Sequence, residues 1–195
     1  MILLESFLSS TALVAIAEIG DKTQLLSLFL AARFRRQAMA IIAGIFVSTI
    51  VNHFAAAWIG QWLAHFFTPD TMRWIVGLTF LGFAGWVLIP DKMDDVEENQ
   101  ASKYGAFLTT AILFFIAEMG DKTQLATVGL AAKYGAEALP FVVMGTTLGI
   151  LIANVPAVFL GEKLLKIIPL DYVRYAAAVL FGIFGAITLF GKSFL

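Results

Sequence analysis

The sequence contains no cysteine and few charged residues. The absence of cysteine excludes disulfide bonds, zinc–thiolate sites and thiol nucleophiles from this chain. Charged residues make up 14% of the chain and apolar residues 60%, whereas soluble domains are about one quarter charged and about half apolar. The mean hydropathy is +0.88. This composition predicts an all-α polytopic membrane protein rather than a soluble globular domain.

Basic residues are not in excess either. The formal net charge is −1 and there is no basic tail, so nothing in the composition suggests a nucleic-acid partner. The first residues lack the basic region of a signal peptide, although Ala15-Ile16-Ala17 mimics a cleavage site. We therefore expect the first apolar run to be retained as a membrane span.

Six apolar runs approach the length of about 20 residues that crosses a bilayer. They are predicted at 7–32, 38–64, 73–89, 106–132, 138–161 and 172–190. A polar segment, residues 90–105, carries five acids and two lysines. It is predicted to be a solvated cytoplasmic linker between two domains, 1–89 and 106–195, although its acids could also bind cations loosely.

The two halves of the chain repeat at an offset near 100 residues. Ala17 begins the stretch AEIGDKTQL, and Ala117 begins AEMGDKTQL. Because each half would hold three spans, an odd number, the second half must insert upside down relative to the first. The sequence thus predicts six transmembrane helices arranged as two inverted three-helix repeats. Further matching pairs are Gly60 and Gly161, Arg73 and Arg174, Gly82 and Gly182, and Gly85 and Gly185.

Lysines and arginines orient the predicted spans. One side of the membrane would carry eight of them and the other side three. The positive-inside rule therefore makes the first side cytoplasmic and places both termini outside. The first group is Arg33, Arg35, Arg36, Lys92, Lys103, Lys163, Lys166 and Arg174, and the second is Arg73, Lys133 and Lys192.

The repeated motif places ionisable side chains at mid-membrane, where each charge costs about 2.5–3.5 kcal/mol on insertion scales. On a helix, the oxygen-bearing side chains of each copy share one stripe. Inverted symmetry would bring both stripes together near the midplane. Such hard oxygens suit Mn²⁺, Ca²⁺ or Mg²⁺, and the carboxylates could also carry protons. The predicted metal ligands are Glu18, Asp21 and Gln24 in the first copy, and Glu118, Asp121 and Gln124 in the second.

Two features of the motif leave alternatives open. The four acids and the two lysines, Lys22 and Lys122, carry a formal charge of −2 if they share one cavity. One divalent cation or two protons would neutralise that charge, whereas charges that only hold helices together would not need the whole motif twice. Gly20, with Asp21 and Gln24 in a capping-box pattern, favours a helix broken at the motif; an unbroken helix with an inward polar stripe is the alternative.

Weaker polar features lie in the second and fifth predicted spans. Ser48 and Asn52 share a helix face, and Asn154 lies in the corresponding part of the fifth span. They are candidate pathway residues, with interhelical hydrogen bonding as the alternative. At an offset of 101, Asn52 aligns with Ala153, so the asparagines are one residue out of register. His53 could relay protons, but a lone histidine is more often a hydrogen-bonded packing residue.

The pattern Glu-φ-Gly-Asp-(Lys/Arg)-(Thr/Ser), present twice, resembles the signature of a family of six-span cation/proton exchangers. That family includes Golgi manganese/calcium transporters and a bacterial manganese exporter, and the resemblance covers essentially the whole chain. It implies antiport with Glu18, Asp21, Glu118 and Asp121 as the metal and proton site. It further implies a bacterial cytoplasmic membrane protein that exports Mn²⁺ or Ca²⁺, has no resident cofactor and is not an enzyme. Lys22, Thr23, Lys122 and Thr123 complete the signature.

Two other functions fit a pair of membrane aspartates less well. An intramembrane aspartyl protease would need such a dyad, but Glu-Ile-Gly and Glu-Met-Gly precede these aspartates instead of the Gly-x-Gly expected there. The extra glutamates and lysines would also have no role in a dyad that shares a proton. An exporter of small organic solutes would more usually carry fewer acids. The sequence therefore favours cation/proton exchange by alternating access between the halves.

Overall fold

The computed structural model describes residues 1–89, 105–161 and 170–191, and within these ranges all regular secondary structure is helical. The predicted linker at 90–105 lies almost wholly outside the described residues. The helices are α1 (Ile2–Glu18), α2 (Lys22–Arg33), α3 (Ala38–Ala64), α4 (Pro69–Trp86), α5 (Gly105–Glu118), α6 (Lys122–Tyr134), the 3₁₀ turn η1 (Ala136–Ala138), α7 (Leu139–Leu160) and α9 (Leu170–Phe190).

Each copy of the repeated motif interrupts a helix. The chain leaves α1 at Glu18 and enters α2 at Lys22 with a bend of 68°. The second copy separates α5 from α6 in the same way. Gly20 and Gly120 have φ angles of +82° and +73°, a region that glycine enters without the steric cost of a Cβ atom. Of the two alternatives that the sequence leaves open, the structure therefore adopts the broken helix.

Several of these helices are suited to a membrane. Three are each long and apolar enough to cross one: α3, α9 and the segment Ala136–Leu160. The bent pair α1–α2 passes the same test as a single span, and α5 is a shorter apolar helix. The described residues thus form an all-helical fold with three or four candidate spans. For the predicted count of six transmembrane spans to hold, α4 and the α5–α6 pair must also cross the membrane.

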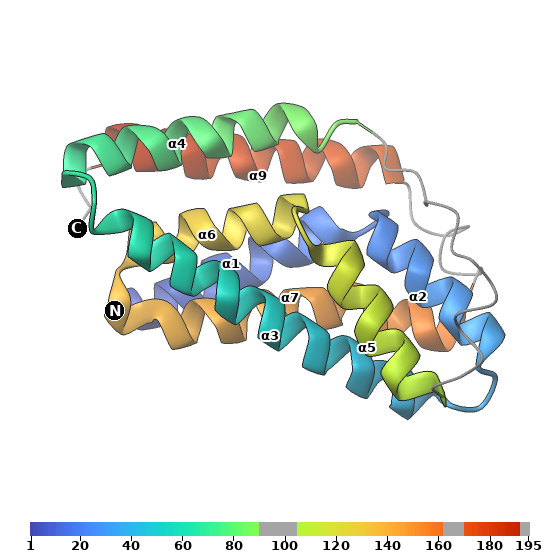
Figure 1. Ribbon diagram of the computed structural model, residues 1–195. Helices are drawn as coiled ribbons and strands as arrows, with labels where there is room; N and C mark the ends of the chain where they lie inside the picture. Colours follow the sequence, from blue (N-terminus) through green and yellow to red (C-terminus); the bar gives the residue numbers. More distant parts are fainter. Residues whose placement is uncertain (90–104, 162–169, 192–195) are drawn as a thin grey trace.

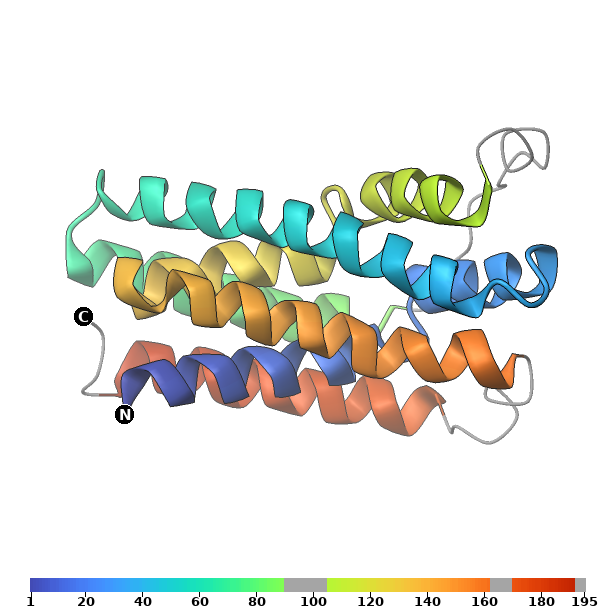
Figure 2. The same ribbon diagram turned by 90° about the horizontal axis from the view of Figure 1, so that it is seen from below.

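Helices of the first half pack mainly against helices of the second. The α1 helix lies along α7, and α3 lies along α5 and α6 (Figures 1 and 2). Glycines permit this close approach. A Cβ atom on Gly145 would come within 2.5 Å of the Phe7 carbonyl oxygen, and one on Gly44 within 2.7 Å of the Phe107 carbonyl oxygen. Corresponding helices of the two halves therefore use corresponding glycines to reach the opposite half.

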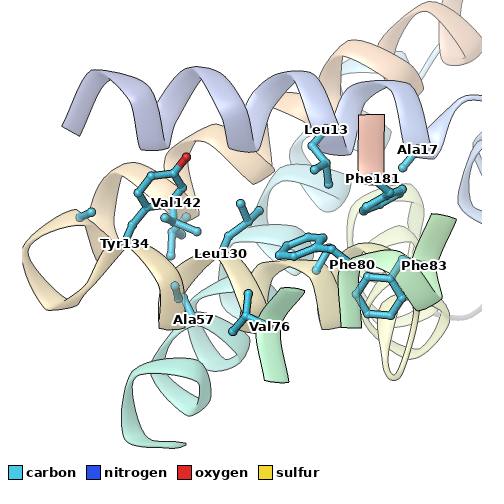
Figure 3. Close-up of a cluster of buried hydrophobic side chains, with 14 of the residues drawn as sticks. Leu13, Ala17, Ala57, Val76, Phe80, Phe83, Leu130, Tyr134, Val142 and Phe181 are labelled. Atoms are coloured by element: carbon cyan, nitrogen blue, oxygen red, sulfur yellow. The ribbon is translucent and has the colours of Figure 1, made fainter. Parts of the chain in front are cut away.

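The α4 and α9 helices lie side by side as a separate layer (Figure 1). The rings of Phe80 and Phe181 stack between them, with centroids 6.0 Å apart and planes at 25°. Figure 3 shows these rings beside Leu130 of α6 and Leu13 of α1. Among the described residues, the pair packs on α1 and α6 and has at most marginal contact with α2 and α5. Of the four half-helices that flank the two motif copies, the layer therefore packs mainly against α1 and α6.

Candidate metal centre

The two helix breaks bring both copies of the motif together in the interior. One carboxylate oxygen each from Glu18, Asp21 and Asp121 lies within 4.8 Å of the other two. All three side chains are buried. Oxygens bound to one Ca²⁺ ion at about 2.3–2.6 Å are at most about 5 Å apart. These three carboxylates, called the trio below, are therefore close enough to share one divalent cation.

Each motif lysine pairs with the aspartate of the other copy. Lys22 Nζ lies 3.3 Å from Asp121 Oδ1, and Lys122 Nζ lies 2.9 Å from Asp21 Oδ1. The ammonium groups offset the negative charge of the trio in the low-dielectric interior, where an uncompensated charge is strongly destabilising. Because the pairing is reciprocal, neither copy of the motif is complete without the other.

Gln24 and Gln124 hold the two breaks in shape. The Oε1 atom of each accepts a hydrogen bond from the backbone N–H of the motif glycine four residues earlier, at 2.9 Å and 2.6 Å. Gln24 Nε2 donates to the carbonyl oxygen of Ala153, and Gln124 Nε2 donates to Asn52 Oδ1. Both polar atoms of each amide thus have protein partners in this structure. That Gln24 and Gln124 bind the metal ion stays a prediction.

The two motif glutamates have different neighbours. Glu18 Oε1 accepts from Asn154 Nδ2 at 3.4 Å, and Glu18 Oε2 has no hydrogen-bond partner in the described part of the chain. Glu118 Oε2 lies 3.4 Å from His53 Nε2 and accepts from Thr123 Oγ1 at 3.3 Å. Of the four predicted acidic ligands, Glu118 is the one that lies outside the trio.

The predicted site residues omit His53, although its side chain is fully buried and faces Glu118. The sequence favoured a packing role for His53, because a lone histidine is more often a hydrogen-bonded packing residue. The sequence does contain a pattern that indicates this contact. At the offset of 101 that relates Gly60 to Gly161, His53 aligns with Asn154, which contacts the other motif glutamate.

The remaining candidate residues make local contacts. Ser48 Oγ donates to a carbonyl oxygen of its own helix at 3.0 Å, and Asn52 Nδ2 donates to a carbonyl oxygen of α5 at 3.2 Å. The backbone N–H of Thr123 donates to Asp121 Oδ2 at 3.3 Å, which caps the start of α6, and the Thr123 hydroxyl oxygen lies 3.2 Å from the same carboxylate oxygen. The Thr23 hydroxyl is buried and, within the described ranges, has no hydrogen-bond partner. It is therefore available for a ligand or a proton.

Comparison with known proteins agrees with this site. A family model described as "Divalent cation/proton antiporter GDT1" matches residues 6–95 and 106–194. The chain belongs to the GDT1 family. The resemblance inferred from the motif is thereby confirmed, and the protein is a member of a family of membrane divalent cation/proton exchangers. GDT1 membership places it among transporters, not among proteases.

Individual relatives cover nearly the whole chain. A protein of Vibrio cholerae named "Putative manganese exporter" is 49% identical over 181 residues, which cover 93% of this chain and 88% of that protein. GDT1-like protein 5 of Arabidopsis thaliana is 27% identical over 220 residues, or 94% of each chain. A GDT1-like protein of Synechocystis is 27% identical over 212 residues, or 97% of this chain and 99% of the relative. No solved structure matches the chain.

Proposed function

We propose that this GDT1 protein exports Mn²⁺ from the bacterial cytoplasm in exchange for protons, with Ca²⁺ as a second substrate. The observation that carries the proposal is the buried trio of Glu18, Asp21 and Asp121 at two helix breaks. Buried carboxylates need either a counter-cation or protons, and each of these groups can hold either. The name of the Vibrio cholerae relative favours Mn²⁺ among the divalent cations.

The charges around the trio suit such an exchange. Three ionised carboxylates with the two lysines, Lys22 and Lys122, leave a formal charge of −1, and Glu118 brings it to −2. One divalent cation or two protons would neutralise that charge. In this proposal the lysines pair with the aspartates while the cation is absent, and release them when it binds. Gln24, Gln124 and Asn52 keep the breaks in place around it.

We propose that α1–α4 and α5–α9 are two inverted three-helix repeats. In Figures 1 and 2, α1 and α2 run in the opposite direction along the molecule to α5 and α6. The α3 helix likewise runs opposite to α7, and α4 opposite to α9. The reciprocal lysine–aspartate pairs and the two segments matched by the family model support the same division. With the basic residues Arg33, Arg35 and Arg36 in the cytoplasm, both termini lie outside.

We propose that access alternates through the layer formed by α4 and α9. This layer packs on α1 and α6 and extends along most of the length of the molecule (Figure 1). The equivalent residues of α5 and α2 are apolar as well. In this structure Leu30 is fully buried beside Ile41 and Ile150, so the second arrangement requires these contacts to change. In this proposal the layer closes the outer end in one arrangement and the cytoplasmic end in the other. The apolar counterparts are Leu13 and Leu113, Ala17 and Ala117, and Leu130 and Leu30.

Transport by purified protein in liposomes tests the exchange. A Mn²⁺ gradient should drive proton movement in the wild type and in Asp70→Asn, whose carboxylate is 83% exposed and lies outside the centre. Asp21→Asn and Asp121→Asn should abolish this movement, because each removes one charge of the trio. Wild-type proton movement in either variant would refute the proposal. Proton movement driven by Ca²⁺ but not by Mn²⁺ would show that the transported metal is Ca²⁺ instead.

A further inference from the structure

Each half places a different side chain against the motif glutamate of the other half. Asn154 faces Glu18, and the equivalent position in the other half is His53. Asn154 is held on both sides of its amide, because Oδ1 accepts from Ser27 Oγ at 2.7 Å and Nδ2 donates to a carbonyl oxygen of its own helix at 3.0 Å. In the part of the chain that the structure describes, His53 Nδ1 has no hydrogen-bond partner. Among the described residues, Glu118 is thus the hydrogen-bond partner of the buried imidazole.

The spacing of His53 and Glu118 is that of two ligands of one metal ion. His53 Nε2 and Glu118 Oε2 are 3.4 Å apart, and both side chains are fully buried. Two ligands that bind an ion at about 2.2 Å and subtend about 100° are separated by about 3.4 Å. Glu118 Oε1 is also buried without a hydrogen-bond partner among the described residues. The pair therefore offers a nitrogen and a carboxylate to an approaching cation.

This pair adjoins the trio. The Thr123 hydroxyl lies 3.3 Å from Glu118 Oε2 and 3.2 Å from Asp121 Oδ2. A cation held by Asp121 is thus one side chain away from the imidazole. Apart from His53, the neighbouring side chains among the described residues that could bind a cation would do so through oxygen atoms.

We infer that His53 is a specificity-determining ligand, whose Nε2 binds the transported ion together with Glu118 and favours Mn²⁺ over Ca²⁺. Imidazole nitrogen binds first-row transition-metal ions, whereas Ca²⁺ takes oxygen ligands. Asn154, which faces Glu18 of the first motif copy, supplies no such nitrogen ligand. The inference rests on the proposed exchange function and adds to it the residue that selects the ion.

Pulsed electron paramagnetic resonance of bound Mn²⁺ tests the ligand directly. The experiment uses purified full-length protein with a histidine-free affinity tag and Mn²⁺ alone as the probe. We expect nuclear modulation from a coordinated imidazole nitrogen in the wild type and its loss in His53→Asn. The control is His65→Asn, because His65 is the second of the chain's 2 histidines and binds the Gln61 carbonyl oxygen at the end of α3. Bound Mn²⁺ without nitrogen modulation in the wild type would overturn the inference.

Ion selectivity in liposomes tests the consequence. Loss of a metal-site contact typically weakens metal affinity about 10- to 100-fold, so His53→Asn should weaken apparent Mn²⁺ affinity about tenfold. Apparent Ca²⁺ affinity should change by less than about twofold. An equal loss for both ions by a folded variant would indicate a structural role and overturn the inference.

A swap variant decides the matter if His53→Asn alone loses all transport. His53→Asn combined with Asn154→His moves the imidazole to Glu18, whose Oε1 lies 3.4 Å from the present Asn154 Nδ2. Nitrogen modulation and preference for Mn²⁺ should return in this double variant. If the double variant transports Ca²⁺ but shows neither nitrogen modulation nor preference for Mn²⁺, the inference is overturned. Normal transport by Asp21→Asn would instead refute the exchange proposal, so the two failures are distinguishable.

Discussion

Single residues of the repeated motif have unequal environments, although the motif itself is nearly identical in both copies. The Lys122 side chain is 3% exposed and that of Lys22 is 26% exposed. Glu18 belongs to the trio, while Glu118 faces a histidine. The centre is therefore asymmetric at the residue scale.

The lysines provide a prediction about stability. Removing one partner of a buried ion pair typically costs about 3–5 kcal/mol because the other charge is left uncompensated. Lys122→Met should therefore lower the unfolding temperature of the detergent-solubilised protein strongly. Lys22→Met should lower it less, because the Lys22 side chain is less buried than that of Lys122. Scanning fluorimetry of both variants without added metal measures the difference, and equal shifts would contradict this account.

At the scale of helical elements, the site is built from breaks rather than from continuous helices. Gly20 and Gly120 turn the chain, Asp21 and Asp121 begin the next half-helix, and a glutamine three residues later returns to the glycine N–H. The breaks place helix N-termini, with their partial positive charge, beside the carboxylates. This arrangement keeps the trio at a fixed place between four half-helices.

Glycine substitutions test the breaks. Gly120→Ala should destabilise the protein by about 1–2 kcal/mol, the cost of a left-handed conformation for a residue with Cβ, because Gly120 has φ of +73°. Gly85→Ala is the matched control, since Cβ atoms at both positions would meet nothing within 4 Å. Gly85 lies inside α4, where alanine is favoured by roughly 0.5–1 kcal/mol. Thermal unfolding should therefore shift in opposite directions, and a stabilising Gly120→Ala would contradict the account.

The repeat, the acids of the motif and the possibility of a break at Gly20 could be predicted from the sequence, because they depend on local pattern and on the cost of charge in lipid. The partners of Lys22 and Lys122 could not be predicted, since each lies one hundred residues away in the other half. The contact of His53 with Glu118 was not predicted, for a different reason. A lone histidine is more often a packing residue, and its contact with Glu118 joins segments that are 65 residues apart in the sequence.

For the molecule as a whole, the layer of α4 and α9 is the part that most clearly breaks the symmetry between the halves. Tyr134 of α6 and Phe184 of α9 approach to 6.3 Å between ring centroids. Their counterparts at an offset of 100 are Phe34 and Ala84. If the layer moves between two equivalent surfaces, the first pair is close in one state and the second pair in the other.

Engineered disulfides test this movement, and the natural chain has 0 cysteines to interfere. Tyr134→Cys with Phe184→Cys should form a cross-link readily, stop Mn²⁺-driven proton movement in liposomes and release it on reduction. Phe34→Cys with Ala84→Cys should also cross-link, but only in molecules that have changed state. Single-cysteine variants serve as controls. Full transport by a completely cross-linked protein would show that the layer does not move.

The reciprocal lysine–aspartate pairs also bear on how the protein is made. Asp21 and Lys22 leave the ribosome one hundred residues before Lys122 and Asp121. At about 5–20 residues per second, this interval lasts about 5–20 s. During that time the nascent first half carries its membrane charges without the partners that the second half supplies. Water or the insertion machinery must therefore accommodate these charges, and synthesis of the second motif is the event that lets the first half reach its final structure.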